Sequence, residues 1–394
     1  MTDIVLSDTQ AAAVREIVAW YQGGRDTPQE FYLAGYAGTG KSTLAKYALA
    51  ELRAHGGLGK TATATFTGKA ASVLRKKGVY DARTVHSLIY VPTEDPETGE
   101  TTFTVAPEAP AADADLIMLD EVSMISQDMA DDVRSFGKKM LVMGDPGQLP
   151  PINGQGAFTN REPDVFLHEV HRQAAESPIL RLATAARQGQ QLPLGEWTDA
   201  VGNVSRVVAH NRDNQHWIYR EDTMPLCGIH RVRHGYTQRI RRMRGFEGPR
   251  PMPGETIICC RNDKKTGLFN GAFGIAGAWA PYPMVGPDLK PMDAPDQIRL
   301  DLEMEDFPGR MIKQQHVNTY LFDQHFDDKI VRPRKVYGLE FDWANLLTVH
   351  KAQGSEFPDV TVIDDSGSFR DDRAKHLYTA LTRASERVTI MQRQ

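Results

Sequence analysis

The chain has 394 residues, a length typical of about two or three domains with a core large enough to need no disulfides. Its 46 basic and 51 acidic side chains give a formal net charge of −5, which argues against coating of nucleic acid by bulk electrostatics. Three cysteines, Cys227, Cys259 and Cys260, show no zinc-ligand spacing, and no stretch resembles a signal peptide or a run of about 20 apolar residues. We therefore expect reduced, buried thiols in a soluble cytoplasmic protein that makes no membrane contact.

The first half of the chain alternates apolar runs with helical patterns, which is typical of a parallel sheet covered by helices. We predict strands at residues 31–34, 61–66, 116–119 and 140–143. Helical patterns separate these strands, for example at residues 41–54 and 69–76. The first α/β domain is therefore predicted to comprise residues 1–90 and 113–195. Chemistry in such a sheet takes place beyond the carboxyl ends of its strands.

Two segments interrupt the α/β alternation. Residues 91–112 contain two short strand-like runs around the turn-forming sequence Pro96-Glu97-Thr98-Gly99-Glu100, and they predict a protruding hairpin. Residues 267–338 are rich in Gly, Pro and alternating apolar and polar residues, and they predict a small inserted β-domain. The second α/β domain is then predicted to comprise residues 196–266 and 339–394.

A Gly-rich loop follows the first predicted strand and precedes a predicted helix. Its sequence, Gly35-Tyr36-Ala37-Gly38-Thr39-Gly40-Lys41-Ser42, matches the Walker A pattern in the context that this motif requires. The glycines let backbone amides approach phosphates, Lys41 would neutralise the β- and γ-phosphates, and Ser42 would bind Mg²⁺. We therefore predict that ATP and Mg²⁺ bind to this loop and to the following Thr43. The alternative to a phosphate-binding loop is a Gly-rich turn that arose by chance.

A second acidic element lies about eighty residues further along the chain. The apolar run at 116–119 ends in Asp120 and Glu121, where a Walker B element belongs. Asp120 would hold Mg²⁺, and Glu121 would orient the attacking water. Acids at a strand end are often only turn or cap residues, so this interpretation depends on the Walker A loop upstream.

The second half of the chain contains one dense basic stretch. Residues 231–250 hold seven arginines and a single acidic residue, Glu247. A solvated helix face and part of a nucleic-acid track are both compatible with this stretch.

Further sequence blocks resemble superfamily 1 DNA helicases, in particular the RecD-like and Dda-like branch that moves 5′ to 3′ on single-stranded DNA. In chain order, the blocks after Walker A are Asp120-Glu121-Val122-Ser123-Met124, Gly144-Asp145-Pro146-Gly147-Gln148-Leu149-Pro150-Pro151, His171-Arg172-Gln173, Thr348-Val349-His350-Lys351-Ala352-Gln353-Gly354-Ser355-Glu356 and Tyr378-Thr379-Ala380-Leu381-Thr382-Arg383-Ala384. The resemblance implies two RecA-like P-loop NTPase domains, with the hairpin inserted in the first. It also implies an SH3-like β-barrel in the second, because Gly267-Leu268-Phe269-Asn270-Gly271 resembles the start of the family's barrel.

The same resemblance assigns catalytic and ATP-binding roles beyond the Walker elements. The implied catalytic residues are Lys41, Asp120, Glu121, Gln148, Arg172 and Arg383. Gln148 would sense the γ-phosphate, and Arg172 and Arg383 would act as arginine fingers on the transferred phosphoryl group. Gln10 takes the place of the family's adenine-reading glutamine, although the neighbouring Ser7 and Asp8 suit a helix cap equally well. Gly354 and Glu356 are also assigned to ATP.

DNA contacts are implied in both domains. The residues are Thr65, Phe66, Thr67, Lys69 and His86 in the first domain, and Thr348, His350 and Gln353 in the second. Hydroxyls, backbone amides and basic groups of this kind bind phosphates without reading sequence. Phe66 stands where relatives often carry proline. Phe103, in the hairpin, resembles the family's strand-separating pin, where an exposed aromatic at the tip would stack on the first base pair; packing of Phe103 against the first domain is the alternative.

The predicted function is ATP hydrolysis coupled to DNA unwinding, with single-stranded DNA and duplex junctions as partners. The resemblance implies a monomer that acts in DNA replication, repair or recombination in a bacterial or phage-infected cell, together with protein partners of those processes. A translocase or repair-complex subunit that needs a partner to unwind, a P-loop phosphotransferase and a non-hydrolysing DNA-binding module are the alternatives. Arginines assigned to ATP in both halves of the chain, with Lys41 and Glu121, favour the helicase.

Overall fold

The computed structural model describes residues 6–55, 57–94, 101–152, 154–169, 177–263, 265–282, 297–306, 309, 311–333 and 338–393. The chain divides into two compact units, Met1–Arg181 (unit 1) and Leu182–Gln394 (unit 2). No helix in these described ranges is long and apolar enough to cross a membrane.

Unit 1 is built on a six-stranded sheet in which all pairs are parallel, in the order β3-β2-β6-β7-β1-β8. Its strands are β1 (Glu30–Gly35), β2 (Thr61–Thr65), β3 (Arg83–Thr84), β6 (Leu116–Asp120), β7 (Lys139–Gly144) and β8 (Val165–Leu167). The four strands predicted in this half are therefore confirmed. Because these strands are parallel, the carboxyl ends of β1 and β6 lie at the same edge of the sheet, where ligands bind in sheets of this kind.

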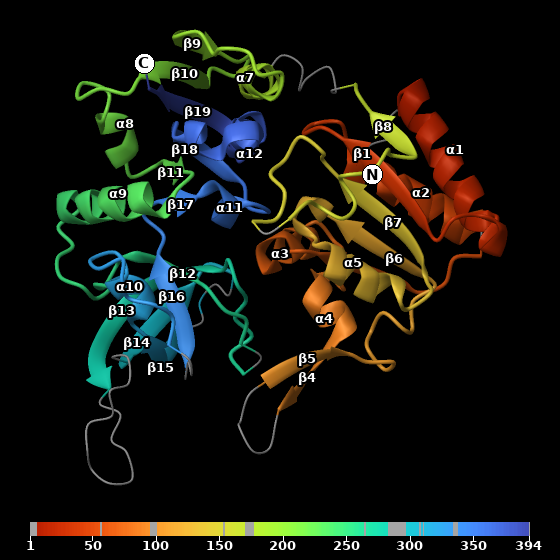
Figure 1. The fold of residues 1–394 in the computed structure, drawn as a ribbon, viewed down its shortest axis with the longest axis horizontal. Helices are drawn as coiled ribbons and strands as arrows, with labels where there is room; N and C mark the ends of the chain where they lie inside the picture. The colour runs from red at the N-terminus through yellow and green to blue at the C-terminus, as the bar shows by residue number, and fades with distance from the viewer. Residues whose placement is uncertain are drawn as a thin grey trace. The chain divides into compact units, whose positions relative to one another are not determined.

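Helices cover both faces of this sheet. The helices are α1 (Asp8–Gln22), α2 (Lys41–His55), α3 (Gly68–Lys76), α4 (Val85–Ile89) and α5 (Gln127–Arg134), and short 3₁₀ turns lie at Gly24–Asp26 (η1) and Val122–Met124 (η2). Successive strand side chains point to opposite faces, so Leu33 packs with α1 and α2, whereas Tyr32 packs with α4 and α5. Figure 1 shows these two helical layers on the sheet. Each fully buried apolar side chain stabilises such a core by about 1.5–3 kcal/mol.

The predicted hairpin is present in unit 1. Strand β4 (Tyr90–Glu94) pairs antiparallel with β5 (Thr101–Val105), and the predicted turn at 95–100 lies outside the described residues. Phe103 lies within β5, opposite Pro92, and therefore not at the tip of the hairpin.

Unit 2 contains a second six-stranded sheet, in the order β17-β11-β18-β19-β10-β9. Its strands are β9 (Gly195–Thr198), β10 (Val204–Ala209), β11 (Met224–Cys227), β17 (Leu347–Thr348), β18 (Phe357–Ile363) and β19 (Ala384–Gln392). All its pairs are parallel except the antiparallel edge pair of β9 with β10. Its helices are α8 (His216–Tyr219), α9 (His230–Met243), α11 (Val349–Ala352) and α12 (Arg373–Leu381), with a 3₁₀ segment at Ser366–Asp372 (η3), and α7 (Pro178–Arg187) spans the boundary of the two units in sequence.

A closed five-stranded barrel forms the rest of unit 2 (Figure 1). It consists of β12 (Thr256–Cys259), β13 (Phe273–Tyr282), β14 (Gln297–Met304), β15 (Met311–Asn318) and β16 (Leu339–Trp343), with the short helix α10 (Tyr320–Asp323) packed near β16. The barrel is larger than the predicted insertion at 267–338, because β12 and β16 pair with each other and close it. β12 is a short apolar run, whereas β16 alternates apolar residues with Glu340 and Asp342, and the side chains of both strands are mostly buried. Their pairing with each other assigns both strands to the barrel.

Candidate functional site

The Walker A loop connects β1 to α2 in unit 1. Gly38 and Gly40 adopt positive φ angles of 79° and 81°, a conformation that residues with a Cβ rarely adopt. The loop therefore turns tightly enough for its backbone amides and the amino-terminal end of α2 to face a phosphate. Lys41 Nζ donates hydrogen bonds to the carbonyl oxygens of Gly35 at 2.6 Å and Tyr36 at 3.1 Å, so its charge lies over the loop.

Of the two Walker B acids, Asp120 is the last residue of β6 and Glu121 follows it, and β6 lies beside β7 in the same sheet. Asp120 is 7% exposed, and Ser42 Oγ donates a hydrogen bond to Asp120 Oδ2 at 3.2 Å. Burial raises the pKa of Asp120 to about 6; the charge of Glu121 acts in the same direction, and Lys41 opposes it. Glu121 has a positive φ of 54°, an uncommon conformation for a residue with a side chain.

Ser42 and Asp120 fit a magnesium site. Two oxygens bound to one octahedral Mg²⁺ at 2.0–2.1 Å lie about 2.9 Å apart, close to the separation between Ser42 Oγ and Asp120 Oδ2. Hydroxyl and carboxylate oxygens are also the donors that this hard cation prefers. Burial and the neighbouring charge of Glu121 raise the pKa of Asp120, and a divalent cation at this position would favour its charged form.

Gln148 lies in the loop after β7 and is buried. Ser123 Oγ, from the segment that follows the Walker B acids, lies 3.5 Å from Gln148 Oε1. Asp145 Oδ1 accepts a hydrogen bond from the Gly147 amide at 2.9 Å, which shapes the loop that carries Gln148. Ser123 was not among the predicted site residues, although it belongs to the sequence block that contains Asp120 and Glu121. Its contact therefore links the Walker B segment to the predicted γ-phosphate sensor.

Gln10 is close to the Walker A loop, but its amide is already bonded there. Its Nε2 donates to the Thr39 carbonyl at 3.3 Å, and its Oε1 accepts from the Ser7 amide at 3.2 Å. Ser7 Oγ in turn accepts from the Gln10 amide, which makes a capping box for α1. The helix-cap alternative is therefore present in the structure, and adenine recognition by Gln10 stays a prediction. Ala37 and Thr43 are partly exposed beside the loop.

Arg383 follows α12 in unit 2 and is 6% exposed. Its guanidinium donates hydrogen bonds to the Thr379 carbonyl at 3.1 Å, the Ser355 carbonyl at 3.3 Å and Thr382 Oγ1 at 3.3 Å. Ser355 lies between the two predicted ATP-binding residues, Gly354 with a φ of 75° and the exposed Glu356. The structure thus brings Arg383 to the segment that carries these residues. The other predicted finger, Arg172, lies outside the described residues.

The predicted DNA-contacting residues of unit 1 gather at the carboxyl ends of β2 and β3, which are neighbouring parallel strands. Thr65 is buried and its Oγ1 donates to the Thr67 carbonyl at 2.9 Å, while Thr67 caps α3 and Phe66 packs on the core. Lys69 is partly exposed and His86 is exposed. The two threonine hydroxyls therefore have local structural roles, and Lys69 and His86 offer the accessible polar groups of this set.

The corresponding residues of unit 2 lie on β17 and α11. Thr348 is buried and its Oγ1 accepts a hydrogen bond from the Lys351 amide, which caps α11. His350 is partly buried, and burial lowers its pKa. Gln353 is buried at the end of α11. Of these three side chains, His350 is the most accessible to a ligand.

Phe103 is 56% exposed, and its ring lies edge-on to the ring of His86, with 5.4 Å between the ring centroids. His86 also contacts Tyr90, whose hydroxyl donates a hydrogen bond to Asp132 at 2.5 Å. One side of the Phe103 ring therefore packs on His86 and the rest of the ring is accessible, while its role as a strand-separating pin stays a prediction. The contact connects the hairpin to a residue that is predicted to contact DNA.

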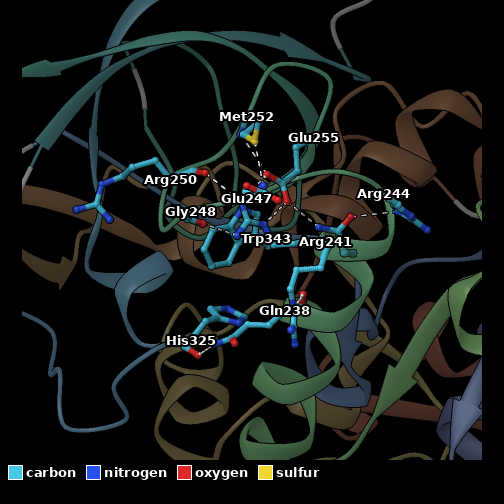
Figure 2. Close-up of polar contacts among 12 residues, drawn as sticks. Gln238, Arg241, Arg244, Glu247, Gly248, Arg250, Met252, Glu255, His325 and Trp343 are labelled. Atoms are coloured by element: carbon cyan, nitrogen blue, oxygen red, sulfur yellow. Dashed lines mark hydrogen bonds and ion pairs between the residues drawn. The ribbon is translucent and has the colours of Figure 1, made fainter.

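Several arginines of the basic stretch at 231–250 are buried in ion pairs, and these belong neither to a solvated helix face nor to an exposed nucleic-acid track. Arg233 forms a buried ion pair with Asp342, and Arg241 forms another with Glu255, which is fully buried. Figure 2 shows Arg241 between Glu255 and Trp343, and its guanidinium carbon lies 4.0 Å from the Trp343 ring centroid. Arg244 and Arg250 also bond within unit 2. Arg233 and Arg241 thus join α9 to the barrel strand β16. Arg231, Arg239 and Arg242 are the exposed arginines of this stretch.

Two family models match the chain. The model described as AAA domain matches residues 5–209, and the model described as UvrD-like helicase C-terminal domain matches residues 344–391. The ATP-dependent RecD2 DNA helicase of Deinococcus radiodurans is 28% identical over 375 residues, which are 90% of this chain and 46% of that protein. The chain thus spans about half the length of this curated relative.

Solved structures of Pif1 helicases have a similar fold. Pif1 from Bacteroides in complex with ADP-AlF3 and single-stranded DNA has a TM-score of 0.54 at 18% identity, covering 98% of this chain and 92% of that chain. Pif1 from Candida albicans has a TM-score of 0.52 at 16% identity, covering 99% and 96%. The fold is therefore Pif1-like with two RecA-like domains. The resemblance to superfamily 1 helicases of the RecD-like branch, predicted from the motifs, is confirmed.

Proposed function

Because the chain belongs to the AAA-domain family, we propose that it is an ATP-dependent DNA helicase that moves 5′ to 3′ on single-stranded DNA and separates duplex strands. The observation that carries the proposal is the convergence of Lys41, Ser42 and Asp120 at the carboxyl ends of β1 and β6. A second RecA-like sheet with the buried Arg383 supports a motor rather than a switch or a small-molecule kinase. A motor needs such a second body to turn hydrolysis into movement.

In this mechanism, the residues of unit 1 bind and orient ATP. The loop amides and Lys41 hold the triphosphate, Ser42 and Asp120 hold the metal, and Glu121 orients the attacking water. Bound Mg²⁺ would neutralise charge on the β- and γ-phosphate oxygens. Gln148 reports the presence of the γ-phosphate, and Arg172 and Arg383 bring positive charge to the transferred group.

The same cycle would change the hold on DNA. Lys69 and His86 in unit 1 and His350 in unit 2 contact the backbone of a single strand, which provides binding without sequence preference. Separating each base pair costs about 1–2 kcal/mol, which one ATP can supply. We also propose that the five-stranded barrel is SH3-like and that the protein acts as a monomer on single strands and duplex junctions.

The proposal is tested by steady-state ATP hydrolysis with and without single-stranded DNA, with Lys41→Ala as the background. We expect strong stimulation by DNA in the wild-type protein and loss of turnover in Lys41→Ala, because the β- and γ-phosphates lose their charged ligand. Glu121→Gln is the matched control: it should keep ATP binding and lose turnover, since only the water-orienting carboxylate changes. No stimulation of the wild-type protein would overturn the helicase proposal.

Phe103→Ala should reduce unwinding of a forked duplex while single-stranded DNA still stimulates ATP hydrolysis, because an exposed aromatic that stacks on the junction base pair is lost. Val105→Ala, at an exposed apolar position two residues along β5, is the control. Unwinding by Phe103→Ala at the wild-type rate would remove the pin assignment. A parallel fall in DNA-stimulated hydrolysis would show instead that Phe103 acts through its contact with His86.

A further inference from the structure

Three aromatic rings from different segments of unit 2 form a row, which we name the ring row: His350 of α11, Phe369 of η3 and His376 of α12. The rings of Phe369 and His376 are stacked, with centroids 4.1 Å apart and an interplanar angle of 23°. The ring of Phe369 also lies 5.9 Å from the ring of His350, at an angle of 30°. Phe369 therefore bridges a predicted DNA-contacting residue and a helix that leads to Arg383.

The ring row packs closely on the turn between β11 and α9. A Cβ atom added to Gly228 in this turn would lie 2.3 Å from the Phe369 ring and 2.8 Å from His376 Nε2, so no side chain fits there. The carboxylate of Asp365 fixes the same turn, since it accepts hydrogen bonds from the amides of Gly228 at 2.6 Å and Ile229 at 3.1 Å. The position of Phe369 and His376 is thus set by rigid backbone on one side.

The imidazole ring of His376 is uncharged and stacks on a neighbouring ring. Its side chain is 0% exposed, and among the described residues neither of its ring nitrogens has a hydrogen-bond partner. Burial lowers the pKa of His376 to about 3, so it carries no charge at neutral pH. Buried polar groups without partners are rare in native proteins and need an explanation. Stacking on Phe369 gives the ring a structural partner, but it does not explain why a polar ring occupies the position.

The backbone beside Phe369 is strained. Arg370 has φ 48° and ψ −112°, outside the helical conformation of the surrounding η3 segment. Such outliers cost about 1–3 kcal/mol and persist where the surrounding structure imposes them, often at switch regions. The turn that presents Phe369 to His350 is therefore held against its local preference.

The other end of α12 contacts the same stretch of chain. Arg383 donates hydrogen bonds to the Ser355 carbonyl and to the Thr379 carbonyl in the last turns of α12. Residues 350–355 are thus held at both ends by residues 369–383: at His350 through the ring row, and at Ser355 through Arg383. A displacement of Arg383 must change its bonds to Ser355 and Thr379, and α12 connects this change to His376.

We propose that Phe369 and His376 are positioning residues that couple the state of Arg383 to the position of His350, and so link nucleotide turnover to the hold on single-stranded DNA. This inference rests on the proposed function. When Arg383 exchanges its carbonyl partners for the phosphoryl group, α12 shifts, and the stacked rings carry the shift to His350. The strength of such coupling is the ratio of the DNA affinities measured with and without bound nucleotide. Typical ratios are about 5- to 150-fold.

The experiment measures the affinity for a fluorescently labelled oligothymidylate without nucleotide and with an ATP analogue that is not hydrolysed. For the wild-type protein we expect the two dissociation constants to differ by about fivefold or more. Phe369→Leu and His376→Leu each replace one ring with an apolar side chain and so remove the stacked pair. In each variant the dissociation constants without and with the ATP analogue should then agree to within about twofold. Phe369→Tyr, which keeps the ring, should retain the wild-type ratio.

Two controls separate this coupling from a purely structural effect and from the proposed function itself. Phe326→Leu removes an exposed phenylalanine elsewhere in unit 2 and should leave the ratio unchanged. Basal ATP hydrolysis without DNA should stay at the wild-type rate in both Leu variants, and thermal melting checks their folding. Wild-type ratios in folded Leu variants, or equal affinities in the wild-type protein, would overturn the inference. Absence of DNA-stimulated hydrolysis in the wild-type protein would overturn the proposed function instead.

Discussion

Arg383→Ala should lower DNA-stimulated ATP turnover about a thousandfold, which corresponds to about 4 kcal/mol of transition-state stabilisation. A guanidinium is permanently charged and planar, and it can offer two parallel hydrogen bonds to the oxygens of the transferred phosphoryl group. In the structure these charged donors are bonded to carbonyls within unit 2, at a net value of about 1.5–3 kcal/mol each. A charged phosphoryl oxygen is a stronger acceptor, so the exchange is favourable when the nucleotide is bound.

The measurement for Arg383 separates turnover from binding. Binding of a fluorescent ATP analogue should change little, because the Walker A loop and Asp120 belong to unit 1. The loss should therefore appear in kcat and not in KM. Arg383→Lys is the matched variant, and most of the loss should persist in it because a point charge does not reproduce the planar fork. Turnover within about tenfold of wild type in Arg383→Ala would argue against the finger assignment, since such a finger is worth about a thousandfold or more.

Arg241→Ala should destabilise unit 2 by about 3–5 kcal/mol, because it leaves the charge of Glu255 buried without its partner. Among the residues that the structure describes, Glu255 would keep hydrogen bonds from the Met252 amide and Asn345 Nδ2. Arg241 also donates to the carbonyls of Gly248 at 2.7 Å and Arg250 at 3.0 Å, and it covers the ring of Trp343 (Figure 2). Urea unfolding followed by tryptophan fluorescence measures the change.

A double variant separates loss of the charge pair from loss of packing. Arg241→Met combined with Glu255→Leu replaces the buried ion pair with apolar side chains, and such exchanges are often neutral or stabilising. We expect the double variant to recover most of the stability that Arg241→Ala loses. A loss below about 1 kcal/mol in Arg241→Ala would mean that Glu255 is compensated without Arg241, since exposed ion pairs contribute that little.

The turn of the Walker A loop could be predicted from sequence because its residues are close together in the chain. Gly35 to Ser42 lie in one turn between a strand and a helix, and Asp120 ends the strand that the apolar run predicts. Local geometry then determines what these residues can do. The barrel and the basic stretch behave differently: β12 and β16 lie outside the insertion that the sequence predicts, and Arg233 and Arg241 are buried although arginines are mostly surface residues.

The reason for that difference is that burial and strand pairing depend on partners far away in the chain. Arg241 is buried because Glu255 and Trp343 come to it, and β12 belongs to the barrel because β16 pairs with it. The segment from Phe369 to His376 contains no motif that predicts its role, since the stacked rings and the close approach to Gly228 arise only on folding.

The sequence by itself determined the Walker A turn between a strand and a helix and the presence of two α/β domains, because such loops and strand periodicity depend on neighbours within a few residues. The tertiary structure alone decided the limits of the barrel, the burial of the arginines in α9, the position of Phe103 within a strand and the row of rings behind His350. These features depend on contacts between residues distant in sequence, whose energies no local pattern contains.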